Sequence, residues 1–151
     1  MVRIIIGADH AGVELKKAIV SYLDKKHIYY EDIGGFDKGA KDDYPDYAFK
    51  VGEKVARDPS ASGILICGSG TGMCIAANKV KGVRASLVYD SYTAKKAKED
   101  NNVNIICLRG KSFSPELAKK LVNIWLETPF SDETRHKIRL LKISKYKKGK
   151  I

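Results

Sequence analysis

The chain has 151 residues, of which 44% are apolar and 30% are charged, and its formal net charge at pH 7 is +10. This composition is typical of a globular protein with a buried core, and we expect one domain over residues 1–151. No apolar run reaches membrane-spanning length, and the apolar start before Gly7 is too short for a signal peptide, so we expect no membrane partner.

The positive charge is concentrated at the C-terminal end. Residues 135–151 hold eight Lys and Arg and no acid, so the preceding 134 residues hold the other 20 bases against 18 acids. A nucleic-acid-binding surface usually spreads its charge over one face and interleaves aromatic residues. Only Tyr146 is interleaved here. The pattern argues against a nucleic-acid partner and favours a local anion site.

The three cysteines, Cys67, Cys74 and Cys107, are odd in number and lie in apolar surroundings. This usage predicts reduced thiols and a cytoplasmic protein. No Cys/His spacing resembles a structural zinc site. Cys74 and Cys107 are interpreted as small buried apolar side chains.

The apolar pattern alternates along the chain between short β-branched runs and helical spacing. Strands are predicted at residues 2–6, 27–33, 63–67, 84–88 and 104–108. Helices are predicted at residues 12–26, 44–57, 73–80, 91–100, 114–128 and from Ser131 or Asp132 onwards. Ser114 is expected to cap the fifth helix, which Pro115 opens. Five strands alternating with helices predict a parallel α/β sheet covered on both faces, in three αβα layers.

In such sheets, ligands bind at the carboxyl ends of the strands, near a topological switch point. Three stretches follow predicted strands: "GADHAG" (residues 7–12), "CGSGTG" (residues 67–72) and "RGKS" (residues 109–112). We therefore expect these stretches to surround one crevice.

The glycine-rich stretch suits an anion. Gly68, Gly70 and Gly72 leave backbone N–H groups unshielded at the start of a predicted helix. The dinucleotide fingerprint fails, because it requires glycine where Met73 stands. The phosphate-binding P-loop also fails, because Val13-Glu14 follows the first stretch. A tight strand-to-helix turn would use the same glycines, so this loop alone leaves both interpretations open.

Other candidate groups flank this loop. A thiol beside a helix N-terminus, such as Cys67, ionises more readily than a free thiol and suits a nucleophile or a base. Asp9 and His10 suit proton transfer, although Asp9 equally suits a helix cap. Arg135 and Arg139 lie four residues apart, so they share one helical face that suits either a phosphate or solvent.

Taken in order, "GADHAGVELK", "DYPDYA", "GILICGSGTGMCIAANK", "GVRA" and "RHKIR" resemble the type B ribose-5-phosphate isomerases. That wider family includes bacterial galactose-6-phosphate isomerase subunits, and the resemblance extends from Arg3 to about Ile143. It implies interconversion of an aldose phosphate and its ketose, with no metal or other cofactor. It also implies a Rossmann-like fold, a homodimer or tetramer with shared active sites, and a C-terminal helix that extends to the partner subunit.

The resemblance also implies roles for single residues. Cys67 would move a proton between C1 and C2 through an enediolate, while the loop amides and Ser69 hold the oxyanion. Some relatives have a glutamate base at the position of Met73, which cannot take a proton, so this chain resembles the thiol type. The matching substrate-binding positions are His10, Tyr44, Gly68, Gly70, Thr71, Gly72, Asn101, Lys111, Arg135 and Arg139, and Asp9 and Asp100 are further catalytic candidates.

Two departures from the family pattern concern the substrate. Cysteine-type relatives have a ring-opening histidine where this chain has Asp100, so ring opening falls to Asp100, Asp9 or His10. Lys111 replaces an arginine and loses its bidentate fork. Ribose 5-phosphate is the first expected substrate. The alternatives are a six-carbon sugar phosphate (allose or galactose 6-phosphate) and a non-catalytic sugar-phosphate or nucleic-acid binding module.

Overall fold

The computed structural model describes residues 3–146, and residues 147–151 of the lysine-rich end lie outside the described residues. All pairings in its five-stranded sheet are parallel, in the order β2-β1-β3-β5-β4. The strands are β1 (Arg3–Ala8), β2 (Tyr30–Gly34), β3 (Ala61–Cys67), β4 (Ala85–Leu87) and β5 (Ile105–Arg109). The predicted parallel sheet is confirmed.

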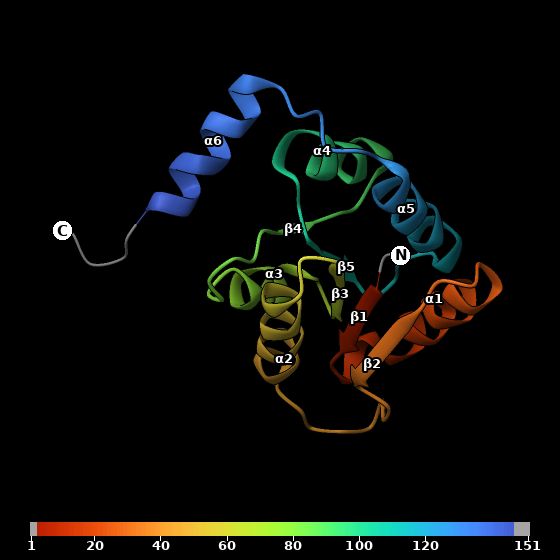
Figure 1. The fold of residues 1–151 in the computed structure, drawn as a ribbon. Coiled ribbons are helices and arrows are strands. Elements are labelled where there is room, and N and C mark those ends of the chain that lie inside the picture. The colour runs from red at the N-terminus through yellow and green to blue at the C-terminus, as the bar shows by residue number, and fades with distance from the viewer. Residues whose placement is uncertain (1–2, 147–151) are drawn as a thin grey trace.

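Helices cover both faces of the sheet, which confirms the three-layer arrangement (Figure 1). The helices are α1 (Val13–Lys25), α2 (Tyr44–Arg57), α3 (Thr71–Ala77), α4 (Ser91–Asn101), α5 (Pro115–Glu127) and α6 (Thr134–Lys145), with a short 3-10 turn at His10–Gly12. Successive strand residues face opposite sides. Ile4 and Ile6 therefore pack towards α1, α4 and α5, whereas Ile5 packs towards α2 and α3. Burial on both sides explains why β1, β3 and β5 are almost wholly apolar.

Most element boundaries differ from the predictions by one to three residues; α3, for example, spans Thr71–Ala77 rather than residues 73–80. Two of these differences have a clear structural cause. The second strand starts at Tyr30 rather than at His27, because His27 has a φ of +54° and belongs to the turn that ends α1. The last helix starts at Thr134 rather than at Ser131 or Asp132. The Ser131 amide donates to the Glu99 carbonyl, and Asp132 has a φ of +56°, so neither residue continues into a helix. The predicted Ser114 cap is confirmed, since its hydroxyl accepts from the Leu117 amide.

The switch point lies between β1 and β3. The chain passes from β1 to β2 on one side, and β3 pairs with β1 on the other side. The carboxyl ends of β1 and β3 lead into residues 9–12 and 68–72, respectively. These two loops therefore flank the position where such a fold binds its ligand.

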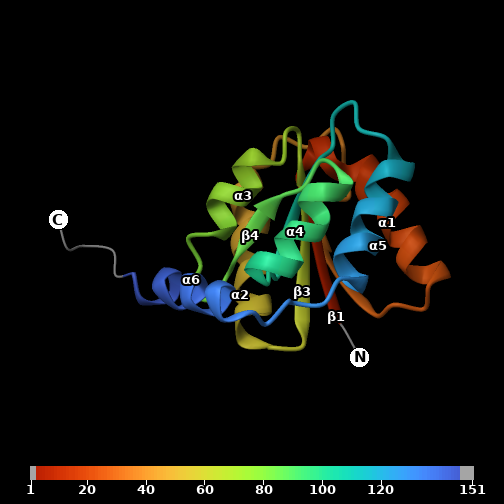
Figure 2. The ribbon, with the colours of Figure 1, turned by 90° about the horizontal axis from the view of Figure 1, so that it is seen from above.

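Helix α6 lies apart from the three layers. Figure 2 shows it beside α4, near the amino ends of the strands and opposite the carboxyl-end loops. His136 is its buried residue, and most of its other side chains are exposed. No helix within residues 3–146 is both long and apolar enough to cross a membrane.

Candidate active site

Three loops meet at the carboxyl edge of the sheet, as the sequence predicts. The Asp9 amide donates to the Ile66 carbonyl at 3.1 Å, and the Gly110 amide donates to the Cys67 carbonyl at 2.8 Å. A Cβ atom on Gly110 would lie 2.5 Å from the Ala11 carbonyl oxygen, so only glycine permits this approach. The loops after β1, β3 and β5 therefore form one continuous edge.

Cys67 ends β3 and is only 4% exposed. The Gly70 amide donates to its Sγ atom at 3.2 Å. Gly70 has a φ of +80°, and a Cβ atom there would lie 2.6 Å from Leu87 Cδ1. This left-handed conformation, which favours glycine, turns the amide back towards the sulfur. Cys67 Sγ is thus held at the base of the loop with a donor aimed at it.

The rest of this loop is ordered by its own side chains and by Tyr44. Ser69 Oγ and Thr71 Oγ1 lie 2.7 Å apart, and the Thr71 amide lies 3.3 Å from Ser69 Oγ, to which it donates. A Cβ atom on Gly72 would lie 2.6 Å from Tyr44 Cζ, so the Tyr44 ring lies directly against the first turn of α3. The loop therefore has two exposed hydroxyls and a tyrosine beside its amides.

Asp9 is nearly buried and accepts a hydrogen bond of 2.9 Å from the Ala11 amide. Burial raises the pKa of its carboxyl group, while the Ala11 amide opposes that shift. Asp9 is therefore both a cap and a carboxyl group that holds a proton more readily than a solvated one.

His10 forms a tight pair with Asp42, a residue that the sequence did not single out. His10 Nδ1 lies 2.7 Å from Asp42 Oδ1, and the Tyr47 hydroxyl donates to the other carboxylate oxygen at 2.9 Å. The hydrogen bond to Asp42 raises the pKa of His10. Burial alone would raise the pKa of Asp42, but hydrogen bonds from His10 and Tyr47 outweigh it and lower that pKa. The pair favours a protonated imidazole.

Lys111 also lies at this edge. Its amide donates to the Gly68 carbonyl at 3.2 Å, and its Cε atom would lie 3.6 Å from a Cβ on Gly68. We call this set of residues the carboxyl-edge group; it consists of Asp9, His10, Tyr44, Cys67, Gly68, Ser69, Gly70, Thr71, Gly72 and Lys111.

The other predicted residues lie elsewhere. Asp100 and Asn101 end α4 and precede the amino end of β5, and Arg135 and Arg139 are exposed on α6. Arg135 Nε donates to Glu133 at 2.7 Å. We call Asp100, Asn101, Arg135 and Arg139 the amino-edge group. Cys67 pairs with Arg109, the last residue of β5, whereas Asp100 and Asn101 precede the first residue of β5. The length of β5 alone therefore separates the two groups by roughly 13 Å. One copy of the chain does not bring them together.

Three further side chains, Met73, Cys74 and Cys107, lie in the same core cluster as Cys67 or pack against it. Met73 is fully buried and presents no proton-transfer group to the loop. Cys107 is buried as predicted, and hydrogen bonding with Cys74 together with burial raises its pKa. The prediction of a buried Cys74 is wrong: its thiol is half-buried and donates to the Ala85 carbonyl at 3.4 Å. Interaction with Cys107 lowers the pKa of Cys74 to about 7.

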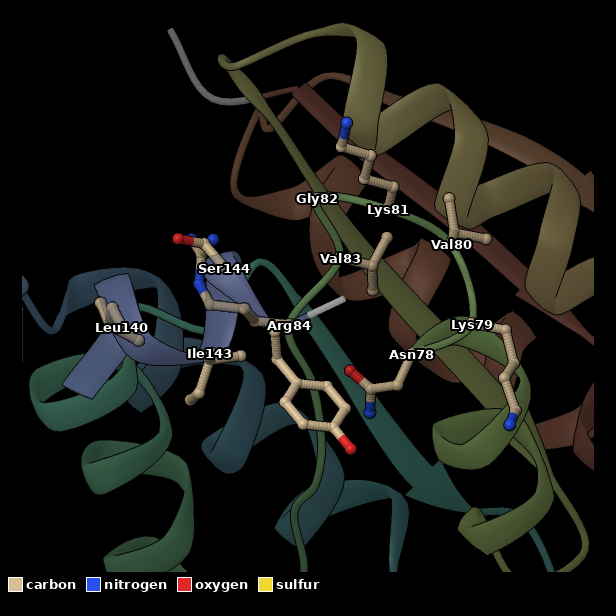
Figure 3. Close-up of a pocket in the computed structure, with 11 residues that line it drawn as sticks. Asn78, Lys79, Val80, Lys81, Gly82, Val83, Arg84, Leu140, Ile143 and Ser144 are labelled. Atoms are coloured by element: carbon tan, nitrogen blue, oxygen red, sulfur yellow. The ribbon is translucent and has the colours of Figure 1, made fainter. Parts of the chain in front are cut away.

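Two large cavities adjoin these groups. One, of about 430 Å³, is lined by Ser69, Leu87, Val88, Tyr89, Arg109 and Phe113. The other, of about 440 Å³, lies between α6 and the segment after α3, where Leu140 and Ile143 face Asn78 and Val83 (Figure 3). Neither cavity includes Cys67 among its lining residues. Within residues 3–146, no three His, Cys, Asp or Glu side chains are grouped to hold a metal ion.

Comparisons with known proteins identify relatives of the chain. A sequence model of the Ribose/Galactose Isomerase family matches residues 4–143. The chain is 42% identical to the putative sugar phosphate isomerase YwlF of Bacillus subtilis over 99% of both chains. It is 40% identical to the D-erythrulose-4-phosphate isomerase of Pectobacterium atrosepticum, over 86% of both.

A solved structure gives the same result. Ribose-5-phosphate isomerase B of Mycoplasma genitalium, with bound ribulose-5-phosphate, superimposes with a TM-score of 0.91 and is 42% identical over 95% of both chains. The family match covers all five strands except Arg3, together with the loops after β1, β3 and β5. The chain belongs to the ribose/galactose isomerase family.

Proposed function

We propose that the chain interconverts ribose 5-phosphate and ribulose 5-phosphate by moving a proton between C1 and C2. The observation that carries this proposal is the placement of Cys67 Sγ, which accepts from the Gly70 amide at the base of a glycine loop at the switch point. The similarity to an enzyme that was solved with ribulose-5-phosphate bound supports a five-carbon substrate over a six-carbon one.

The proposed reaction begins on the open-chain aldose phosphate. The Cys67 thiolate removes the proton from C2, and the electron pair moves towards the carbonyl oxygen to give an enediolate. The thiol then returns the proton to C1, which leaves the ketose. The Gly70 amide stabilises the anionic sulfur through its hydrogen bond. A thiol base requires a reducing compartment, which is consistent with the three free cysteines and a cytoplasmic protein.

Negative charge develops on the substrate oxygen opposite the base. The Gly70 and Thr71 amides are engaged with Cys67 and Ser69, so the oxyanion is assigned to the other loop amides and to the Ser69 hydroxyl. Asp9 is suited to pass a proton between O1 and O2, because burial raises its pKa. His10, whose pKa is raised by its hydrogen bond to Asp42, and Tyr44 would contact the sugar, and Lys111 would contact the phosphate.

A second copy of the chain would complete the site. Asp100, Asn101, Arg135 and Arg139 lie at the opposite edge from Cys67, yet they match substrate-binding positions. We propose a homodimer, or a tetramer built from such dimers, in which the amino-edge group of one copy faces the carboxyl-edge group of the other. In support, α6 exposes Ile138, Leu141 and Ile143, and the large cavity in Figure 3 lies along the same helix. Helix α6 would then extend to the partner subunit.

The test is the steady-state rate on ribose 5-phosphate for the wild type and Cys67→Ala. Loss of a positioned base should lower kcat by about 10²–10⁴-fold, while a non-isomerisable sugar-phosphate analogue still binds. A wild type that binds the analogue but does not turn over any sugar phosphate would support the binding module. Retention of the rate in Cys67→Ala would remove the thiol from the mechanism.

A second candidate substrate has four carbons. The relative from Pectobacterium atrosepticum, 40% identical over 86% of this chain, is a D-erythrulose-4-phosphate isomerase. The same proton transfer at C1 and C2 would act on that ketose and its aldose. Comparing kcat/KM for the four-, five- and six-carbon phosphates decides the question, and the largest value identifies the substrate.

A further inference from the structure

His136 is a buried ionisable residue that the proposed mechanism does not use. It is 2% exposed, whereas its neighbours on α6 are exposed. Its Nδ1 atom lies 2.7 Å from Ser131 Oγ, and its Nε2 atom lies 3.9 Å from Asp100 Oδ1. The imidazole is therefore fixed at one nitrogen, and its other nitrogen faces the carboxylate at the end of α4.

The chemistry of the substrate makes this placement relevant. An aldopentose 5-phosphate closes to a furanose in water, and its C2 hydrogen becomes acidic only once C1 is an aldehyde. Ring opening requires a proton for the ring oxygen O4 as the C1–O4 bond breaks, and a base for the hydroxyl proton on O1. An aspartate carboxylate is ordinarily ionised at neutral pH and has no proton to give. Asp100 alone is therefore a poor ring-opening acid.

We propose that His136 is a positioning residue that supplies Asp100 with the proton for ring opening. In its cationic form the imidazole donates from Nδ1 to Ser131 Oγ, and its Nε2 proton faces Asp100 Oδ1 at an ion-pair distance of 3.9 Å. Asp100 first takes the Nε2 proton of His136 and then passes it to O4 as the C1–O4 bond breaks, so Asp100 ends as a carboxylate and His136 as a neutral imidazole. The O1 proton goes to a base of the other copy, so the substrate gains one proton at O4 and loses one at O1. This inference rests on the proposed function and on the shared site.

The charged groups around the pair favour this role for His136. Lys96 Nζ lies 3.4 Å from Asp100 Oδ1 and 2.7 Å from Glu99 Oε2. Hydrogen bonding to Glu99 and then to Asp100 raises the pKa of Lys96, so its ammonium keeps its proton at neutral pH. Glu133 and Arg135, which also face this region, pair with one another at 2.7 Å. His136 is the remaining group that faces Asp100.

The first experiment uses His136→Asn in the full-length enzyme, with ribose 5-phosphate carrying hydrogen or deuterium at C2. We expect kcat to fall by about tenfold or more. The deuterium isotope effect on kcat should be close to unity and no larger than in the wild type, because ring opening, which breaks no C–H bond, becomes limiting. The neighbouring Lys137→Gln, which loses only a contact of 3.1 Å to Asp132, is the matched control and should behave as the wild type.

A merely structural role predicts a different result. If His136 only anchors α6, its loss displaces the whole amino-edge group and slows proton transfer as well, so the isotope effect stays well above unity or rises. That outcome, or an unchanged kcat, would overturn the inference while leaving the isomerase itself intact. Inactivity of the wild type on ribose 5-phosphate would instead overturn the proposed function.

Two further variants keep the test decisive if His136→Asn folds poorly. Asp100→Asn should show the same low kcat and the same isotope effect, and the double variant should lose no more than either single one. Asp100→His, made in the His136→Asn background, should restore most of the rate because an imidazole then faces the ring directly. Failure of this rescue in a folded double variant would contradict the inference.

Discussion

At the scale of single residues, His10 and Asp42 hold each other in complementary ionisation states. The hydrogen bond raises the pKa of His10 and helps to lower that of Asp42. The group with a raised pKa contributes stability that is lost as the pH rises through that pKa. The group with a lowered pKa contributes stability that is lost as the pH falls through it. The pair therefore stabilises the fold between the two shifted values, a range that includes mildly acidic pH.

Replacing Asp42 with Asn should remove the carboxylate that raises the pKa of His10. We expect the pKa of the His10 imidazole to fall towards its ordinary value of about 6.5, and KM for the sugar phosphate to rise at neutral pH. An NMR titration of the His10 ring protons measures the first effect, and rates at several pH values measure the second. An unchanged His10 titration would show that Asp42 does not control its charge.

The backbone conformation of Gly70 positions the amide that donates to Cys67 Sγ. Gly70→Ala places a side chain at a φ of +80° and 2.6 Å from Leu87 Cδ1. We expect a loss of about 1–3 kcal/mol in the free energy of unfolding, together with a lower kcat, because the amide moves away from Cys67. Urea unfolding and steady-state rates provide the measurements. Gly39→Ala, on an exposed loop without a positive φ, is the control that should leave both unchanged.

At the scale of elements, α6 packs only a small part of its surface against the rest of its own chain. His136 is its buried residue, while Ile138, Leu141 and Ile143 are about half exposed or more. An amphipathic helix gains most of its stability from packing its apolar face. The position of α6 beside α4 therefore leaves an apolar face available to a second copy.

Leu141→Glu should disrupt that packing. We expect the oligomer to dissociate towards monomers and kcat to fall in parallel, because a charged side chain would be buried against apolar surface. Light scattering coupled to size-exclusion chromatography measures the mass. The exposed Lys142→Glu, which changes charge on the same helix, serves as the comparison. An active monomer of Leu141→Glu would contradict the shared site.

At the scale of the whole molecule, the two groups of predicted site residues lie at opposite edges of one sheet. Their separation can be tested by complementation. Cys67→Ala and Arg139→Ala should each be nearly inactive alone. When the two are co-expressed, half of the dimers are mixed, and each mixed dimer has one intact site, so about a quarter of the wild-type activity should return. No recovery in verified mixed dimers would place both residues in the same site of one copy.

The sequence predicts the carboxyl-edge group well, because one topological rule brings the ends of parallel strands together. Cys67 ends such a strand, and Asp9 and Lys111 follow strands that are likewise recognisable from their apolar runs. Asp42 could not be predicted in this way. It lies in an irregular loop, and only the path of that loop determines that Asp42, rather than the adjacent Asp43, faces His10. The His136–Asp100 contact also escapes, because it depends on how α6 packs on α4.

The distance between the two edges has a kinetic consequence. If each active site needs residues from both protomers, dilution itself inhibits the enzyme, because the dissociation of one dimer removes two active sites. Specific activity would then rise with total protein concentration, and the midpoint of that rise would coincide with the midpoint of the monomer–dimer equilibrium.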